Sequence, residues 1–167
     1  NQFMENFNWE TFTKKIAVKS TVEAMYSAWT IPREIESWFL SRAEFDRPNG
    51  EPVPRYENIE ANDVYRWSWY LYEPTETGRV LEENGKDLLK FTFAGACVVE
   101  VKLTQHGDHV LVELTQNEIP ADDASKREIR IDCDSGWSFF LVNLKSVYEG
   151  GLDLRNKNAC FRGVVNY

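Results

Sequence analysis

An apolar stripe near the C-terminus constrains this chain more than any other feature of its sequence. The apolar residues of the stripe recur at steps of three and four: Trp137, Phe140, Leu141, Leu144, Val147 and Tyr148. On a helix these residues share one face, which must be buried against another surface. Ser125 with Glu128 matches a capping box at the helix start, and Gly150-Gly151 predicts its end. The sequence therefore predicts a long helix over residues 125–150.

Gly136 lies inside this predicted helix. A glycine in a helix interior costs about 1 kcal/mol relative to alanine. We therefore expect the backbone of another segment to approach the helix closely at Gly136.

Extended strands are predicted for much of the chain before the helix. Most of them follow from alternation of apolar and polar residues, which is typical of a strand with one buried face. The predicted strands cover residues 11–19, 41–47, 65–72, 78–83, 86–93, 99–104 and 110–115. Asn84-Gly85 predicts a hairpin turn between two of them. Short connections favour antiparallel neighbours, so one face of the sheet is left for the long helix to cover.

Two short helices are predicted between the first two strands. Ser20 with Glu23 matches a capping box, and apolar residues then follow at helical spacing as far as Trp29. Pro32 suits the first turn of a second helix. The order predicts an α+β fold in a single domain over residues 1–167, with a core over about 11–151 and a C-terminal tail over 152–167.

Composition and charge exclude several classes of function. The formal net charge is −8 and the basic residues are scattered, so the chain lacks the basic surface typical of a nucleic-acid-binding protein. No apolar run approaches the roughly 20 residues of a membrane span. We expect a cytoplasmic protein, either a monomer or a homodimer, with no nucleic-acid partner.

The cysteines do not indicate a disulfide scaffold or a zinc site. Cys97, Cys133 and Cys160 are widely spaced, with no CxxC pair and no neighbouring histidine. Cys133 as a nucleophile is one alternative, but a buried structural thiol is the more common role.

The remaining titratable groups form no recognisable catalytic constellation. His106 and His109 fall at a predicted turn, where solvated turn residues are more common than a general base. Asp132 and Asp134 flank Cys133 and would point in different directions on a helix, so we expect both to be solvated. The sequence therefore predicts no metal site, no cofactor and no catalytic residue.

Aromatic residues are abundant, at 14% of the chain. They and neighbouring aliphatic residues are candidates to line a ligand cavity, but periodicity alone does not distinguish a cavity from a filled core. The candidates are Trp38, Phe39, Trp67, Trp69, Phe91, Phe93, Val99, Val101, Trp137, Phe140, Leu141 and Leu144. Candidates for polar contacts to a ligand are Arg47, Arg66, Tyr70 and Glu82.

Four segments together resemble a known family. They are AMYSAWTIPREIESWF (24–39), FDRPNGE (45–51), GRVLE (78–82) and GWSFFLVNLKSVYEGGLDLR (136–155). In this order they resemble the family related to the C-terminal domain of the activators of the heat shock protein 90 ATPase, within the START-like (SRPBCC, Bet v 1-like) superfamily. The resemblance implies a helix-grip fold, in which a curved antiparallel sheet wraps around a long C-terminal helix and encloses an elongated apolar cavity.

Three functions are consistent with these features. The leading hypothesis is a non-enzymatic module that holds a hydrophobic or amphipathic small molecule between sheet and helix. The second is a protein-interaction module with a filled core, for which the resemblance implies a chaperone as partner. The third is a cyclase- or hydratase-like enzyme, which requires acid-base groups that face the interior.

Overall fold

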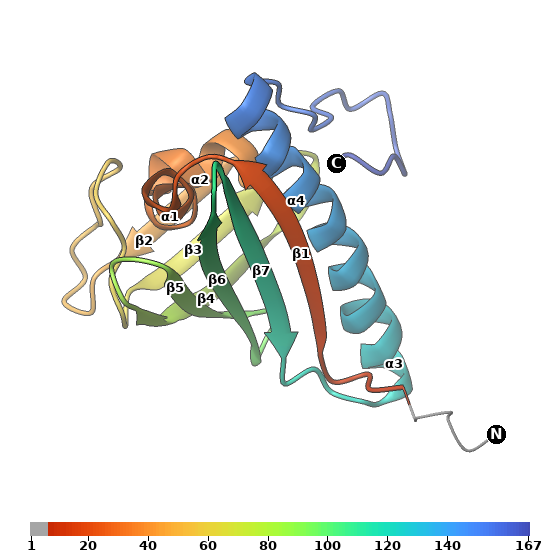
Figure 1. The fold of residues 1–167 in the computed structure, drawn as a ribbon. Helices are drawn as coiled ribbons and strands as arrows, with labels where there is room; N and C mark the ends of the chain where they lie inside the picture. The colour runs from red at the N-terminus through yellow and green to blue at the C-terminus, as the bar shows by residue number, and fades with distance from the viewer. Residues whose placement is uncertain (1–6) are drawn as a thin grey trace, which may run out of the picture.

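A curved antiparallel sheet lies against the long C-terminal helix (Figure 1). The computed structural model describes residues 7–167, so the first six residues of the predicted domain lie outside the described residues. The seven strands run in the order β1-β7-β6-β5-β4-β3-β2. Their bounds are β1 Phe12–Lys19, β2 Arg42–Asp46, β3 Val64–Trp69, β4 Tyr72–Glu83, β5 Leu88–Phe93, β6 Cys97–His106 and β7 His109–Asn117. The predicted α+β class and the helix-grip arrangement are confirmed.

Strand register places the core on one face of the sheet. Phe12 pairs with Gln116, Gln116 with Val99, Val99 with Phe91, and Phe91 with Val80, so these residues form one continuous row across the sheet. All members of the row are buried. Because side chains alternate between faces along a strand, the rows two residues away face the same interior.

Two short helices, α1 (Val22–Thr30) and α2 (Pro32–Trp38), follow β1 as predicted. The N-cap of α1 is Thr21, whose Oγ1 accepts a hydrogen bond from the N–H of Ala24 at 3.2 Å. The predicted capping box at Ser20 is therefore wrong by one residue, because Thr21 is the residue with extended backbone before the first turn. Pro32 occupies the first turn of α2, as predicted.

Pro32 also leaves a carbonyl without its usual partner. In a continuous helix the C=O of Ala28 would accept from the N–H of residue 32, but proline has none. The indole Nε1 of Trp38 donates to this C=O instead, at 2.8 Å. The side chain of Trp38 thereby joins the end of α2 to α1.

The long helix consists of three contiguous segments. These are α3 (Asp123–Ser125), the π-helix η1 (Lys126–Ile131) and α4 (Asp132–Gly150). The N-cap is Asp122, whose carboxylate accepts from the N–H of Ser125 at 2.9 Å. The predicted start at Ser125 is therefore one turn too late. Gly151, with φ 74°, ends α4 as the sequence predicts.

The expected close approach at Gly136 is wrong. A Cβ at Gly136 would meet nothing within 4 Å, whereas one at Gly78 would lie 2.5 Å from Oγ1 of Thr92 and 2.6 Å from Cζ of Tyr65. The tight glycine is thus in the sheet, where the Tyr65 ring lies over β4 and its hydroxyl donates to the C=O of Thr92 at 2.6 Å. There is room for a Cβ atom at Gly136, but not at Gly78.

The turns between strands differ in how well the sequence predicts them. Asn84-Gly85 forms the expected turn, in which the Asn84 Oδ1 accepts from the N–H groups of the next residues and Gly85 has φ 72°. The strand predicted over 65–72 is wrong at its end, because β3 stops at Trp69 and Leu71 adopts φ 58° in a tight turn into β4. A left-handed leucine is rare, so the sequence carries no signal for this turn.

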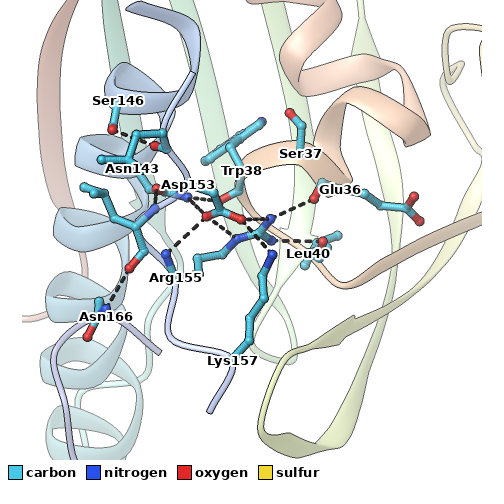
Figure 2. A network of polar contacts seen from close by, with 12 residues as sticks. Glu36, Ser37, Trp38, Leu40, Asn143, Ser146, Asp153, Arg155, Lys157 and Asn166 are labelled. Carbon is cyan, nitrogen blue, oxygen red and sulfur yellow. Dashed lines mark hydrogen bonds and ion pairs between the residues drawn. The ribbon is translucent and has the colours of Figure 1, made fainter. Parts of the chain in front are cut away.

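The C-terminal tail is tied to the domain by a buried polar network (Figure 2). Arg155, only 9% exposed, donates to the C=O groups of Leu40 at 3.1 Å and Glu36 at 2.9 Å. Its Nε and Nη2 both bond the Asp153 carboxylate, at 2.9 Å each. The fully buried Asn143 of α4 donates to Asp153 at 3.1 Å and accepts from the N–H of Leu154 at 2.7 Å. The tail therefore covers the end of α2 and is held by α4.

No helix in residues 7–167 combines the length and the apolar character that crossing a membrane requires.

Gly136→Ala is expected to stabilise the protein by about 0.5–1 kcal/mol, because it removes a helix-interior glycine at an open position. The matched variant Gly78→Ala is expected to lose about 1–3 kcal/mol, because its methyl group overlaps Tyr65 and Thr92. Urea unfolding of both variants measures the two effects. Equal effects in the two variants would contradict the assignment of the tight glycine to β4.

Asp153→Asn is expected to lower the unfolding free energy by about 1–3 kcal/mol at pH 7. Burial acts to raise the pKa of Asp153, but hydrogen bonds from Arg155, Lys157 and Asn143 outweigh it and hold this pKa well below its usual range. The ionised carboxylate therefore stabilises the folded state above the unfolded pKa of about 3.9, and this contribution is lost as pH falls through the folded value. The deficit of the variant should shrink below about pH 4.

The control for this variant is Asp132→Asn, at an exposed residue of α4. Urea unfolding at pH 7 and pH 3 compares the three proteins. A deficit in Asp153→Asn that is the same at both values would contradict the role assigned to the ionised carboxylate.

Candidate functional site

An aromatic cluster fills the space between the sheet and α4. Phe39, just after α2, is its centre, with ring centroids 5.0 Å from Trp137, 4.9 Å from Phe140, 5.6 Å from Trp67 and 5.7 Å from Trp69. Each aromatic pair adds about 0.5–1.5 kcal/mol beyond simple area burial. Helix α2, helix α4 and strand β3 therefore meet through one set of rings.

The apolar cavity candidates all belong to this core. Most are buried, and Trp69 and Phe93 are partly buried at its edge. The structure therefore brings together Trp38, Phe39, Trp67, Trp69, Phe91, Phe93, Val99, Val101, Trp137, Phe140, Leu141 and Leu144. That they line a ligand site stays a prediction.

The enclosed space beside the cluster is small. A cavity of about 10 Å³ is lined by residues of α1, α2 and strands β3 to β5, including Trp29, Phe39, Trp67 and Phe91. This volume is close to the minimum that holds one water molecule. Side chains therefore occupy the interior almost completely in this structure.

Buried N–H donors face this packed interior without partners. Among the described residues, the Nε1 atoms of Trp29 and Trp67 are buried and make no hydrogen bond, and both side chains line the small space beside the cluster. By contrast, Nε1 of Trp137 donates to Oε1 of Gln116 at 3.0 Å. An unpartnered buried donor costs about 1–3 kcal/mol. These two indole N–H groups therefore have no acceptor among the described residues.

The thiols near Gln116 are protonated at neutral pH. Burial raises the pKa of Cys133 to about 11, and the neighbouring Gln116 amide only partly opposes this shift. Burial also raises the pKa of Cys97. Because the thiolate is the nucleophilic form, these raised pKa values disfavour both thiols as nucleophiles, and the structural role expected for Cys133 stays a prediction.

Glu76 is an inward-facing carboxyl group that the sequence analysis missed. Burial raises its pKa, and it accepts a hydrogen bond from the N–H of Ala94. Glu76 lies two residues before Gly78 and four before Val80 on β4, so its side chain faces the same side of the sheet. This period of two is the signal that could have identified it. Its bond to the β5–β6 turn uses one carboxylate oxygen to hold the turn in place.

The four polar candidates each contact another part of the protein. Arg47 bonds the buried Asp63 at 2.6 Å, Arg66 bonds Glu44 at 3.1 Å, and Glu82 pairs with Lys90 at 3.4 Å. The ring of Tyr70 lies 5.1 Å from the Arg155 guanidinium. None of the four is among the described residues that line the enclosed space. A role for them in ligand binding stays a prediction.

Three other titratable candidates are His109, Asp132 and Asp134. His109 is partly exposed beside Asp108 at the β6–β7 turn, where it was expected. Asp132 is exposed as expected, but Asp134 is only 27% exposed and pairs with Lys14 and Arg130, so the expectation that it is solvated is wrong. In residues 7–167 no group of three or more His, Cys, Asp or Glu side chains could hold a metal ion.

Comparisons with known proteins agree with this fold. The family model described as Activator of Hsp90 ATPase homolog 1-like protein matches residues 19–149. A search of curated proteins gives no match.

Several solved structures are similar to this chain. SSP2350 from Staphylococcus saprophyticus has a TM-score of 0.68 at 18% identity, over 87% of this chain and 96% of that one. The Aha1 dimer from Colwellia psychrerythraea has a TM-score of 0.64 at 15% identity, over 84% and 97%. DynU16, from the dynemicin biosynthetic locus, has a TM-score of 0.66 at 17% identity, over 89% and 50%.

The buried tryptophans Trp38 and Trp67 differ in whether the indole N–H has a hydrogen-bond acceptor. Trp38→Phe and Trp67→Phe remove similar volumes, but the first also leaves the C=O of Ala28 without a donor. We therefore expect Trp38→Phe to lose about 1 kcal/mol more stability than Trp67→Phe. Urea unfolding measures both variants, and equal losses would show that the Trp67 N–H has a partner in the folded protein.

Proposed function

Because this chain belongs to the family of Activator of Hsp90 ATPase homolog 1-like proteins, we propose that it is a binding module that holds a hydrophobic or amphipathic small molecule between the sheet and α4. The observation that carries the proposal is the pair of buried donors Trp29 Nε1 and Trp67 Nε1, which lack partners among the described residues. A ligand that is mostly apolar and carries oxygen acceptors would satisfy both the aromatic walls and these donors.

A ligand of useful size requires the interior to open. The enclosed space is only about 10 Å³, so rings must move when a ligand enters. The partly exposed rings of Trp69 and Phe93 lie at the edge of the core, and their centroids are 6.3 Å apart. They are the side chains that can turn outward at least cost, because each already contacts solvent. Entry past Trp69 and Phe93 would lead directly to Phe39 and Trp137.

Binding fits the chemistry of the interior better than catalysis does. The thiols of Cys97 and Cys133 have raised pKa values, and one carboxylate oxygen of Glu76 accepts from the N–H of Ala94. An acid-base enzyme of the cyclase or hydratase kind needs such groups in contact with its substrate. The similar protein DynU16 belongs to a biosynthetic locus, which supports a link to small molecules without requiring catalysis.

Chaperone interaction is the second candidate, and the filled interior favours it. If the core is permanently packed, function must lie on the outer surface, as expected for a partner of the kind that the family description names. Stimulation of a heat shock protein 90 ATPase by the purified protein is the direct test.

Native mass spectrometry of the freshly purified protein tests small-molecule binding. We expect a defined extra mass, or uptake of the neutral probe N-phenyl-1-naphthylamine, that disappears after denaturing extraction. The double variant Trp29→Phe, Trp67→Phe should bind an acceptor-bearing ligand several-fold more weakly, because it lacks both indole donors. A clean apo mass together with no probe uptake would overturn the proposal and favour the outer surface.

A further inference from the structure

The inward stripe of the long helix begins with a charged residue. Arg130, in η1, lies seven residues before Trp137 and is 9% exposed. Its guanidinium lies 4.8 Å from the ring centroid of Phe12 and 5.2 Å from that of Phe7. Phe12 pairs with Gln116 across β1 and β7, so Arg130 lies at the same end of the interior as Gln116.

One edge of the Arg130 guanidinium has no acceptor. Nη1 donates to Oδ2 of Asp134 at 2.8 Å. Nε is buried without a partner among the described residues, and Nη2 makes no hydrogen bond to them. The Nε and Nη2 donors form the fork that binds a carboxylate through two parallel hydrogen bonds.

Asp134 is shared between two cations. Besides its bond from Arg130, its Oδ1 lies 2.5 Å from Nζ of Lys14. The side chains of Lys14, Arg130 and Asp134 are 31%, 10% and 27% exposed, so Arg130 is the most deeply buried of the three. The shared carboxylate leaves the buried Nε of Arg130 without an acceptor among the described residues.

The helix around Arg130 also has an unusual geometry. Arg130 lies in a six-residue π-helix, η1, between two α-helical segments. Insertions of this kind cost stability and are frequent at functional sites. Here the π-helix places Arg130, rather than an apolar residue, at the start of the inward stripe.

We propose that Arg130 binds the carboxylate of the ligand through Nε and Nη2, so that the ligand is an organic acid with an apolar body. The body would extend from Arg130 past Gln116 towards Trp137 and Phe39. This inference rests on the proposed function and specifies its ligand class.

Matched acids and esters test the inference. Isothermal titration at pH 7.5 with 2-naphthoate, methyl 2-naphthoate, decanoate and methyl decanoate compares ligands that differ only in the charged end. The parent protein should bind at least one acid about tenfold or more tightly than its ester. Arg130→Gln should lose this preference while it keeps the affinity for the ester.

Two further variants control for charge and folding. Lys15→Gln removes a charge from an exposed side chain of β1 and should keep the parent's preference. Arg130→Lys keeps the charge but not the fork, so its acid preference should fall several-fold even if Arg130→Gln does not fold. Circular dichroism establishes which variants are folded.

The outcomes separate the two proposals. Equal binding of acid and ester by the parent, or an acid preference that survives in Arg130→Gln or is undiminished in Arg130→Lys, would overturn the role of Arg130 while small-molecule binding stands. Failure of every acid and ester to bind, together with no uptake of N-phenyl-1-naphthylamine, would overturn the proposed function and this inference with it.

Discussion

Burial of the apolar face of α4 against the sheet is the interaction on which the rest of the structure depends. Trp137 joins the two layers, because its ring packs on Phe39 and Phe93 and its Nε1 bonds Gln116 of β7. Phe39, just after α2, and Trp67 of β3 meet at the same point, with ring centroids 5.6 Å apart. The curved sheet is thus held against the helix by packed aromatic rings.

The interior between the sheet and α4 is lined by aromatic rings, but it also contains buried polar atoms. Pro32 removes one donor, and Trp38 replaces it at the C=O of Ala28. Elsewhere the balance is reversed, because the indole N–H groups of Trp29 and Trp67 are buried donors that find no acceptor among the described residues. Native proteins pair nearly all buried polar groups, and the proposed binding role rests on these unpaired donors.

Electrostatics separates a structural site in the C-terminal tail from a candidate binding site at the start of the long helix. At the C-terminal end, Arg155 is saturated by Asp153 and by the carbonyls of Glu36 and Leu40, so this buried arginine is structural (Figure 2). At the N-terminal end, Arg130 shares Asp134 with Lys14 and keeps a free edge. All three guanidinium nitrogens of Arg155 therefore donate hydrogen bonds, whereas Arg130 keeps a buried donor without an acceptor among the described residues.

The sequence by itself determined the order of elements, the inward face of α4 and the end of that helix at Gly151, because these follow from periodicity and from glycine's tolerance of positive φ. It did not determine the turn at Leu71, the cap at Asp122 or the role of Gly78, since each depends on which segments become neighbours. The aromatic candidates were found because rings dominate cores. Arg130 and Glu76 were missed, because a charged residue looks like a surface residue until the fold buries it. Only the tertiary structure decided which polar groups find partners, since their partners are distant in sequence.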